Sequence, residues 1–168
     1  MIVWHERSRE ERNLLNPAFC STLLWQAGKG ASENRNSPRS SLSYIEAFLI
    51  LPLVLHQGTR ESLPSRINSS LPVWVNDNPL VIISLPNRTR ALVLYTKEAI
   101  SFGGTGGLFS VEGGQLLISA ERESAIRTMV LGTSDEVQQC MKKARFLGKW
   151  FTHTGTPETI FTLLGVRP

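Results

Sequence analysis

The stretch "GLFSVEGGQLLIS", residues 107–119, decides the fold class, because its pattern differs from the rest of the chain. Two short apolar runs, 108–111 and 116–118, lie on either side of the dipeptide Gly113–Gly114. A Gly-Gly pair between two strand-like runs is typical of a tight β-hairpin. The sequence therefore predicts one hairpin over 107–119, in a chain whose other segments have mostly helical patterns.

The segments before the hairpin have helical apolar spacing. The most hydrophobic of them predicts a buried helix over 43–56, with Pro52 near its end or at a kink, and a buried strand as the alternative. Thr59 is expected to cap a short helix over 60–67. Helical structure then continues over 70–102, as far as the glycines that precede the hairpin.

Helices followed by a hairpin resemble a winged helix-turn-helix domain. In this interpretation residues 43–119 form the winged-helix core and 107–119 form the wing. Pro86 leaves open whether 79–102 is one kinked helix or two, because proline removes a backbone donor inside a helix. We expect the fold class to be mainly α (α+β), with helices flanking this core at both ends.

The N-terminal flank predicts a helix over 17–28. Asn16 provides a side-chain cap and Pro17 occupies the first helical position, where a missing N–H costs nothing. Apolar residues then recur at spacings of three and four. Gly28 and Gly30 follow and are expected to end the helix.

The C-terminal flank predicts two further helices within 134–165. Thr133 and Glu136 have capping-box spacing, and the helix that they begin runs to about Phe151. A break then precedes a last short helix that starts at a Thr-Pro pair and ends at a glycine. We expect all of these elements to form one domain over 1–168.

The helix over 134–151 has two apolar faces when its residues are placed at 100° intervals. Phe146 and Trp150 lie almost opposite the core stripe, with Lys142, Lys143 and Lys149 beside them. This second face predicts a contact within the chain, for example with the final helix, or a docking surface for another protein, or stacking on nucleic acid. The core stripe consists of Val137, Cys140, Met141, Ala144, Leu147, Gly148 and Phe151.

Two groups of residues are candidates for binding. The candidates for partner binding are aromatic or cationic: Phe146, Trp150, Lys149, Arg145, Lys142, Arg60 and Arg167. The candidates for nucleic-acid binding could meet DNA phosphates, although a solvated surface is the alternative: Arg66, Arg88 and Arg90.

The sequence contains no recognisable catalytic, metal or cofactor motif. The three histidines lack partners at metal-ligand spacing, and "FGGTGG" (102–107) lacks the lysine of a phosphate-binding loop. No serine-nucleophile motif occurs. We therefore expect a protein that is not an enzyme and binds no cofactor or metal. The net charge of +4 permits an anionic partner without requiring one.

The remaining features favour a cytoplasmic protein. The spacing of Cys20 and Cys140 suggests neither a zinc site nor a small disulfide scaffold, so two buried free thiols are expected, as in a reducing compartment. The longest apolar run, 47–55, is far shorter than the roughly 18 residues that span a bilayer. The charged start of the chain does not look like a signal peptide.

Five stretches together resemble a known family: "NPAF", "FLILPLVLHQGTRESLP", "YTKEAISFG", "SDEVQQCMKKARFLGKWF" and "ETIFTLLGVRP". Over residues 16–168 the chain resembles the middle component of bacterial three-component ABC-ATPase systems. It is similar to the small subunit of Lamassu-type anti-phage and anti-plasmid defence. The matching positions are Asn16, Pro17, Thr59, Arg60, Leu63, Pro64, Arg145, Phe146, Leu147, Lys149, Trp150, Phe151, Gly165, Arg167 and Pro168.

The resemblance implies an adaptor without catalytic activity of its own. Such proteins accompany an SMC-like ABC ATPase, which senses foreign DNA, and an effector that is often a nuclease. The resemblance also implies a winged-helix-like accessory subunit, in agreement with the helix-then-hairpin pattern. A stand-alone winged-helix regulator that binds DNA is the alternative. A neighbouring gene for an SMC-like ATPase would favour the adaptor.

Overall fold

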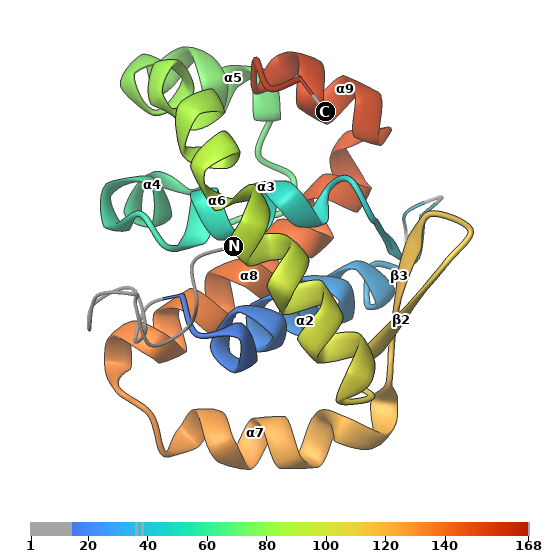
Figure 1. Cartoon of the computed structure of the whole chain (residues 1–168). Coiled ribbons are helices and arrows are strands. Elements are labelled where there is room, and N and C mark those ends of the chain that lie inside the picture. Colours follow the sequence, from blue (N-terminus) through green and yellow to red (C-terminus); the bar gives the residue numbers. More distant parts are fainter. Residues whose placement is uncertain (1–14, 36, 38, 168) are drawn as a thin grey trace.

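A computed structural model describes residues 15–35, 37 and 39–167, and Figure 1 shows the fold. It is mainly α with a small antiparallel sheet, so the predicted class is confirmed. The strands are β1 (Leu42–Ser43), β2 (Phe109–Glu112) and β3 (Gln115–Ile118). The helices are α2 (Pro17–Ser32), α3 (Ala47–Val54), α4 (Gln57–Ser62), α5 (Leu71–Asp77), α6 (Pro79–Thr105), α7 (Glu123–Leu131), α8 (Asp135–Thr154) and α9 (Pro157–Leu163), with a short 3-10 turn at Ala120–Arg122.

Helices α2 and α8 cross at the centre of the molecule with their backbones in contact. A Cβ added to Gly30 of α2 would lie 1.9 Å from the carbonyl oxygen of Arg145, and one added to Gly148 of α8 would lie 1.8 Å from that of Ala27. Only glycine fits at these two positions. The prediction that the glycines end the first helix is therefore wrong, because α2 continues to Ser32 and uses them for close packing.

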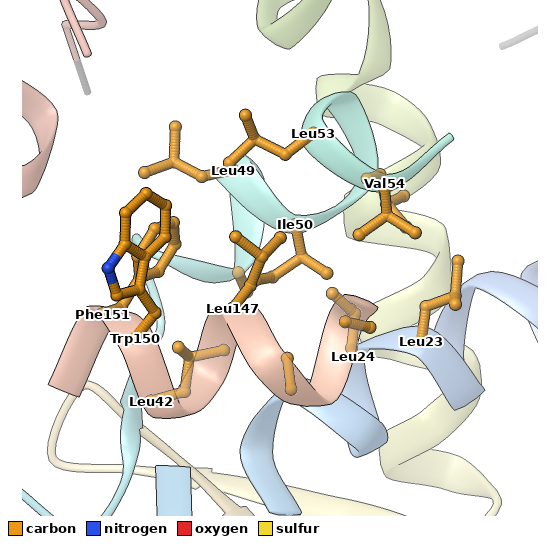
Figure 2. Close-up of a cluster of buried hydrophobic side chains, with 14 of the residues drawn as sticks. Leu23, Leu24, Leu42, Leu49, Ile50, Leu53, Val54, Leu147, Trp150 and Phe151 are labelled. Atoms are coloured by element: carbon orange, nitrogen blue, oxygen red, sulfur yellow. The ribbon is translucent and has the colours of Figure 1, made fainter. Parts of the chain in front are cut away.

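The hydrophobic core lies between this crossing and α3 (Figure 2). Seven of the eight residues of α3 are buried, as expected for the most apolar segment, and Pro52 lies near the end of the helix. The core side chains of α2, α3 and α8 that Figure 2 labels are at most 1% exposed: Leu23, Leu24, Leu49, Ile50, Leu53, Val54, Leu147, Trp150 and Phe151.

The sheet contains the predicted hairpin and one short strand that the sequence does not reveal. Gly113 and Gly114 have φ angles of 55° and 74°, which fits a two-residue turn that needs positive φ at both positions. β3 pairs with β2 and also with β1, where Leu42 faces Leu116, so the strand order is β1-β3-β2. A two-residue strand has too few positions for an alternating pattern.

Between β1 and the hairpin, α6 resolves a choice that the sequence left open, and α4 differs from its prediction. α6 is one continuous helix that includes Pro86, which resolves the choice between one helix and two. α4 spans residues 57–62 instead of 60–67, and its cap is His56 instead of Thr59. The Nδ1 atom of His56 accepts a hydrogen bond from the Thr59 backbone N–H at 3.1 Å.

The C-terminal helices start at short polar caps. Ser134 caps α8 by accepting the N–H of Val137, so the expected cap at Thr133 is one residue too early. α9 begins as predicted, with Thr156 as its cap and a proline at the first helical position. α7, between the sheet and α8, corresponds to no predicted element.

Candidate partner-docking surfaces

Trp150 belongs to the interior of the isolated chain. Its side chain is 1% exposed, and its indole N–H donates a 2.7 Å hydrogen bond to the carbonyl of Ser69. Its ring meets that of Trp74 edge-on, with centroids 5.7 Å apart. These contacts come from α5 and the segment before it. Of the open alternatives, Trp150 therefore makes a contact within the chain, and its role in partner binding stays a prediction.

Phe146 is half-buried beside Trp150, with ring centroids 5.6 Å apart. The ammonium of Lys143 lies 5.6 Å from the Phe146 ring centroid and donates to the carbonyl of Leu63 at 3.0 Å. The segment between α4 and α5 thus covers part of the second apolar face of α8. Phe146 keeps enough exposure to stand at the edge of a docking surface.

Replacing Trp150 by phenylalanine tests how much the indole hydrogen bond contributes. Trp150→Phe leaves the Ser69 carbonyl without its donor, so the free energy of unfolding should fall by about 1–3 kcal/mol. Chemical denaturation with urea measures this difference. Phe146→Leu is the control, because it leaves the indole bond in place. Equal stability of Trp150→Phe and the wild type would contradict a role for the bond.

Arg145 and Lys149 both form ion pairs with Glu33 at the end of α2. Arg145 donates to both carboxylate oxygens of Glu33, with its Nε 3.1 Å from one of them, and the ammonium of Lys149 lies 3.0 Å away. Burial alone would raise the pKa of Glu33, but the hydrogen bonds from the two cations outweigh it and hold the pKa below its ordinary value. Both cations remain more than one third exposed.

Arg60 and Arg88 stabilise the C-terminal end of α3. Arg60 is 3% exposed, and its Nη1 donates to the carbonyl of Val54 at 2.8 Å. Arg88 donates to the carbonyl of Pro52 and to the hydroxyl of Thr59, each at 2.9 Å. Cations are favourable at a helix C-terminus, where carbonyls lack intrahelical donors. The guanidinium groups of these two candidates are therefore already hydrogen-bonded within the chain.

Arg60 also connects α4 to α8, because its Nη2 lies 3.1 Å from the carboxylate of Glu136. The other candidates lie at the surface. Lys142 on α8 is exposed and forms no ion pair with the described residues. The exposed candidates away from α8 lie in the loop before α5, on α6 and at the C-terminal end: Arg66, Arg90 and Arg167.

Three strongly exposed apolar side chains lie where α5 turns into α6. Leu80 and Ile83 are 80% and 74% exposed and lie one turn apart on α6, while Val73 on the neighbouring α5 is 57% exposed. We call these three residues, together with the exposed Pro72 and Pro79, the α5–α6 corner. Large exposed apolar patches on soluble proteins typically mark interaction sites.

The comparison with protein families identifies the chain. The family model described as "ABC-three component (ABC-3C) system Middle Component 3" matches residues 4–168. The chain belongs to this family. It is a middle component of a three-component ABC system, as the sequence resemblance indicates. No curated protein and no solved structure matches the chain.

The middle component also contains a buried ion pair that the sequence does not reveal. Glu46 is fully buried, and its two carboxylate oxygens accept hydrogen bonds from Arg39, each at 2.9 Å. Arg39 also donates to the carbonyl of Phe151, which attaches the loop before β1 to α8. One feature of the sequence could have indicated this ion pair: Glu46 comes directly before the most apolar run. A carboxylate buried there needs a cationic partner.

Hollows on both sides of α7 give the middle component a second candidate surface. A hollow of about 550 Å³ lies between α7 on one side and α2, α6 and α8 on the other, and its lining includes Phe102 and Met129. Between α7, α2 and α8 lies another of about 390 Å³, whose lining includes Trp25 and Lys142. Met141 of α8 lines both. α7 therefore rests on the rest of the molecule with space on each side.

The two cysteines of the middle component lie in its interior. Cys20 and Cys140 are buried free thiols, as predicted, and burial together with the charge of Glu98 raises the pKa of Cys20 to about 12. A thiol with such a pKa stays protonated at neutral pH.

The described residues contain no group of three potential metal ligands. None of the described helices has the length and apolar character to cross a membrane.

Proposed function

We propose that this middle component is a non-catalytic adaptor in a cytoplasmic defence complex of the Lamassu type. In this proposal it links an SMC-like ABC ATPase, which senses foreign DNA, to an effector that is often a nuclease. Membership of the middle-component family supports the multi-subunit context. The resemblance of several motifs to the small Lamassu subunit supports the finer assignment.

The α5–α6 corner is the observation that carries this proposal. Three apolar side chains there are more than half exposed, and Leu80 and Ile83 are at least 74% exposed. Apolar anchors surrounded by polar residues suit the centre of a protein–protein interface. The corner is built from two helices that a short turn joins (Figure 1), so its side chains are presented on regular structure.

Charging the corner tests the adaptor. Leu80→Asp combined with Ile83→Asp should reduce the amount of at least one other component that co-purifies with the chain by tenfold or more. The isolated variant should stay folded, because both side chains already face water. Affinity purification of the co-expressed three-component system, with each subunit quantified, measures the effect.

Leu94→Asp is the matched control, because Leu94 lies further along α6 and is 42% exposed. Normal recovery of both other components with the folded double variant would show that the corner is not a docking site. Failure of the wild-type chain to bind either component would overturn the adaptor itself.

The alternative is a stand-alone winged-helix regulator that binds DNA. The sheet order β1-β3-β2 and the hairpin that projects at one side (Figure 1) favour it, because a wing of this kind suits DNA contact. Arg66 and Arg90 are the exposed cations that remain from the predicted phosphate-binding set. The isolated chain would then bind duplex DNA, with an affinity that falls steeply as salt rises. Titration of a labelled duplex at several salt concentrations separates the two functions.

A further inference from the structure

The hollow between α2, α7 and α8 has an apolar lining at its centre. Trp25 of α2 and Met141 of α8 are at most 2% exposed and form its deep part. Val130 and Leu131 of α7 line the opposite side, and Leu131 is 70% exposed. The volume of about 390 Å³ has room for one or two large apolar side chains.

The rim of the same hollow carries an excess of positive charge. Arg127, Lys142 and Arg145 line it, together with the single carboxylate of Glu123. That carboxylate is already paired with Lys29, at 2.7 Å. The rim therefore has three cations, and its one anion is neutralised by a residue outside the lining.

Two of the three rim cations are available for an external anion. Arg145 is engaged by Glu33, whereas Arg127 and Lys142 are exposed and form no ion pair within the described part of the chain. They come from different helices, α7 and α8, and line the same hollow. A partner that places carboxylates beside an apolar side chain would complement both the lining and the rim.

The attachment of α7 leaves this site adaptable. Ile126 is its only residue that is buried, while Met129 is 48% exposed on the side of the other hollow. An element with few buried contacts has low local stability and can shift to close on a ligand. α7 and the firmly packed α8 thus form two walls of different rigidity.

We propose that the α7–α8 hollow binds an acidic amphipathic segment of another subunit of the three-component system. An apolar side chain of that segment enters the hollow, and its carboxylates pair with Arg127 and Lys142. This inference rests on the proposed adaptor function and adds a second docking site with a defined partner chemistry.

A protein segment fits the hollow better than nucleic acid does. Single strands bind through aromatic side chains on which bases stack, and the one ring in the lining, that of Trp25, is 1% exposed. Phosphate binding also draws on longer tracks of cations than the two that are free here.

Photo-cross-linking in the assembled complex tests the occupant directly. Leu131 is replaced with the photo-reactive amino acid p-benzoylphenylalanine, which its 70% exposure should tolerate. The expected product is a cross-link to a segment of another subunit that is rich in Asp or Glu next to an apolar residue. The same replacement at Val111, in the hairpin and 43% exposed, is the control. Cross-links from Leu131 only to DNA, to a basic segment or to nothing would overturn the proposal.

Charge reversal provides the second test. Arg127→Glu combined with Lys142→Glu should reduce that cross-link by at least tenfold, while Arg90→Glu combined with Lys97→Glu, an equal charge change at exposed positions of α6, should not. Circular dichroism and thermal melting verify that both variants are folded. An undiminished cross-link in the first variant would contradict the assigned role of the rim.

A peptide experiment separates this inference from the adaptor proposal. Labelled 15-residue peptides that tile the other two components are titrated onto the isolated full chain, with fluorescence anisotropy as the readout. Binding of acidic peptides that the Arg127 and Lys142 reversal abolishes supports the hollow, whether or not the complex assembles. Binding of no peptide, or binding that the reversal leaves unchanged, overturns it even when the complex assembles normally.

Discussion

Gly148→Ala is expected to destabilise the protein by at least about 3 kcal/mol, which is a large part of the stability of an ordinary domain. The added Cβ would lie 1.8 Å from the carbonyl oxygen of Ala27 and 3.0 Å from the backbone nitrogen of Ala31. Both clashes are with backbone atoms, so no side-chain rotation relieves them and α2 must move away from α8. The gain of about 1 kcal/mol in helix propensity does not offset such overpacking.

Thermal melting and urea denaturation of the purified variant measure this loss. Gly104→Ala is the matched control, because Gly104 lies in α6 and the nearest atom to its added Cβ is 4.0 Å away. That change should be neutral or stabilising by up to about 1 kcal/mol. Nearly identical melting of Gly148→Ala and the wild type would mean that α2 and α8 do not cross at backbone contact.

Arg39→Ala is expected to cost about 3–5 kcal/mol, because it removes the partner of a fully buried carboxylate. Among the described residues, Glu46 would then keep the 2.8 Å hydrogen bond from the Ser43 backbone N–H as its one remaining side-chain bond. The loop before β1 would also lose the attachment to the Phe151 carbonyl. The free energy of unfolding in urea measures the change.

A double-mutant cycle distinguishes the ion pair from simple loss of packing. Arg39→Met combined with Glu46→Leu replaces both charges with apolar groups and should recover part of the lost stability, since apolar replacement of a buried pair is often close to neutral. Arg35→Ala, at an exposed position of the same loop, should change little. The cycle also needs the single variants Arg39→Met and Glu46→Leu. If the double variant loses as much unfolding free energy as the two single variants together, the two residues are not coupled.

The candidate site was only partly predictable from the sequence. The helical wheel places Phe146 and Trp150 on a second apolar face of α8, and that face exists. It does not reveal that Ser69 and Trp74 cover Trp150, because those residues are some 80 positions away along the chain. The α5–α6 corner was equally hard to predict, because an apolar residue in a helix suggests burial, and only the tertiary structure shows that these side chains are exposed.

The sequence by itself determined the elements whose signals are local. Gly113–Gly114 specifies the hairpin turn, the Thr156–Pro157 pair starts α9, and the composition of 47–54 makes α3 the central buried helix. In each case the residues that specify the element are neighbours in the chain, so their preferences for turns, caps and burial can be recognised without the fold.

Only the tertiary structure decided what glycines, arginines and aromatic residues do at long range. Gly30 allows α2 to cross α8 at Gly148 instead of ending α2, and Arg60 and Arg88 bind carbonyls at the end of α3 instead of facing solvent. The physical reason is that a close backbone contact or a buried carbonyl exists only once distant segments have packed. The same residue types would suit a turn or an exposed surface equally well before packing occurs.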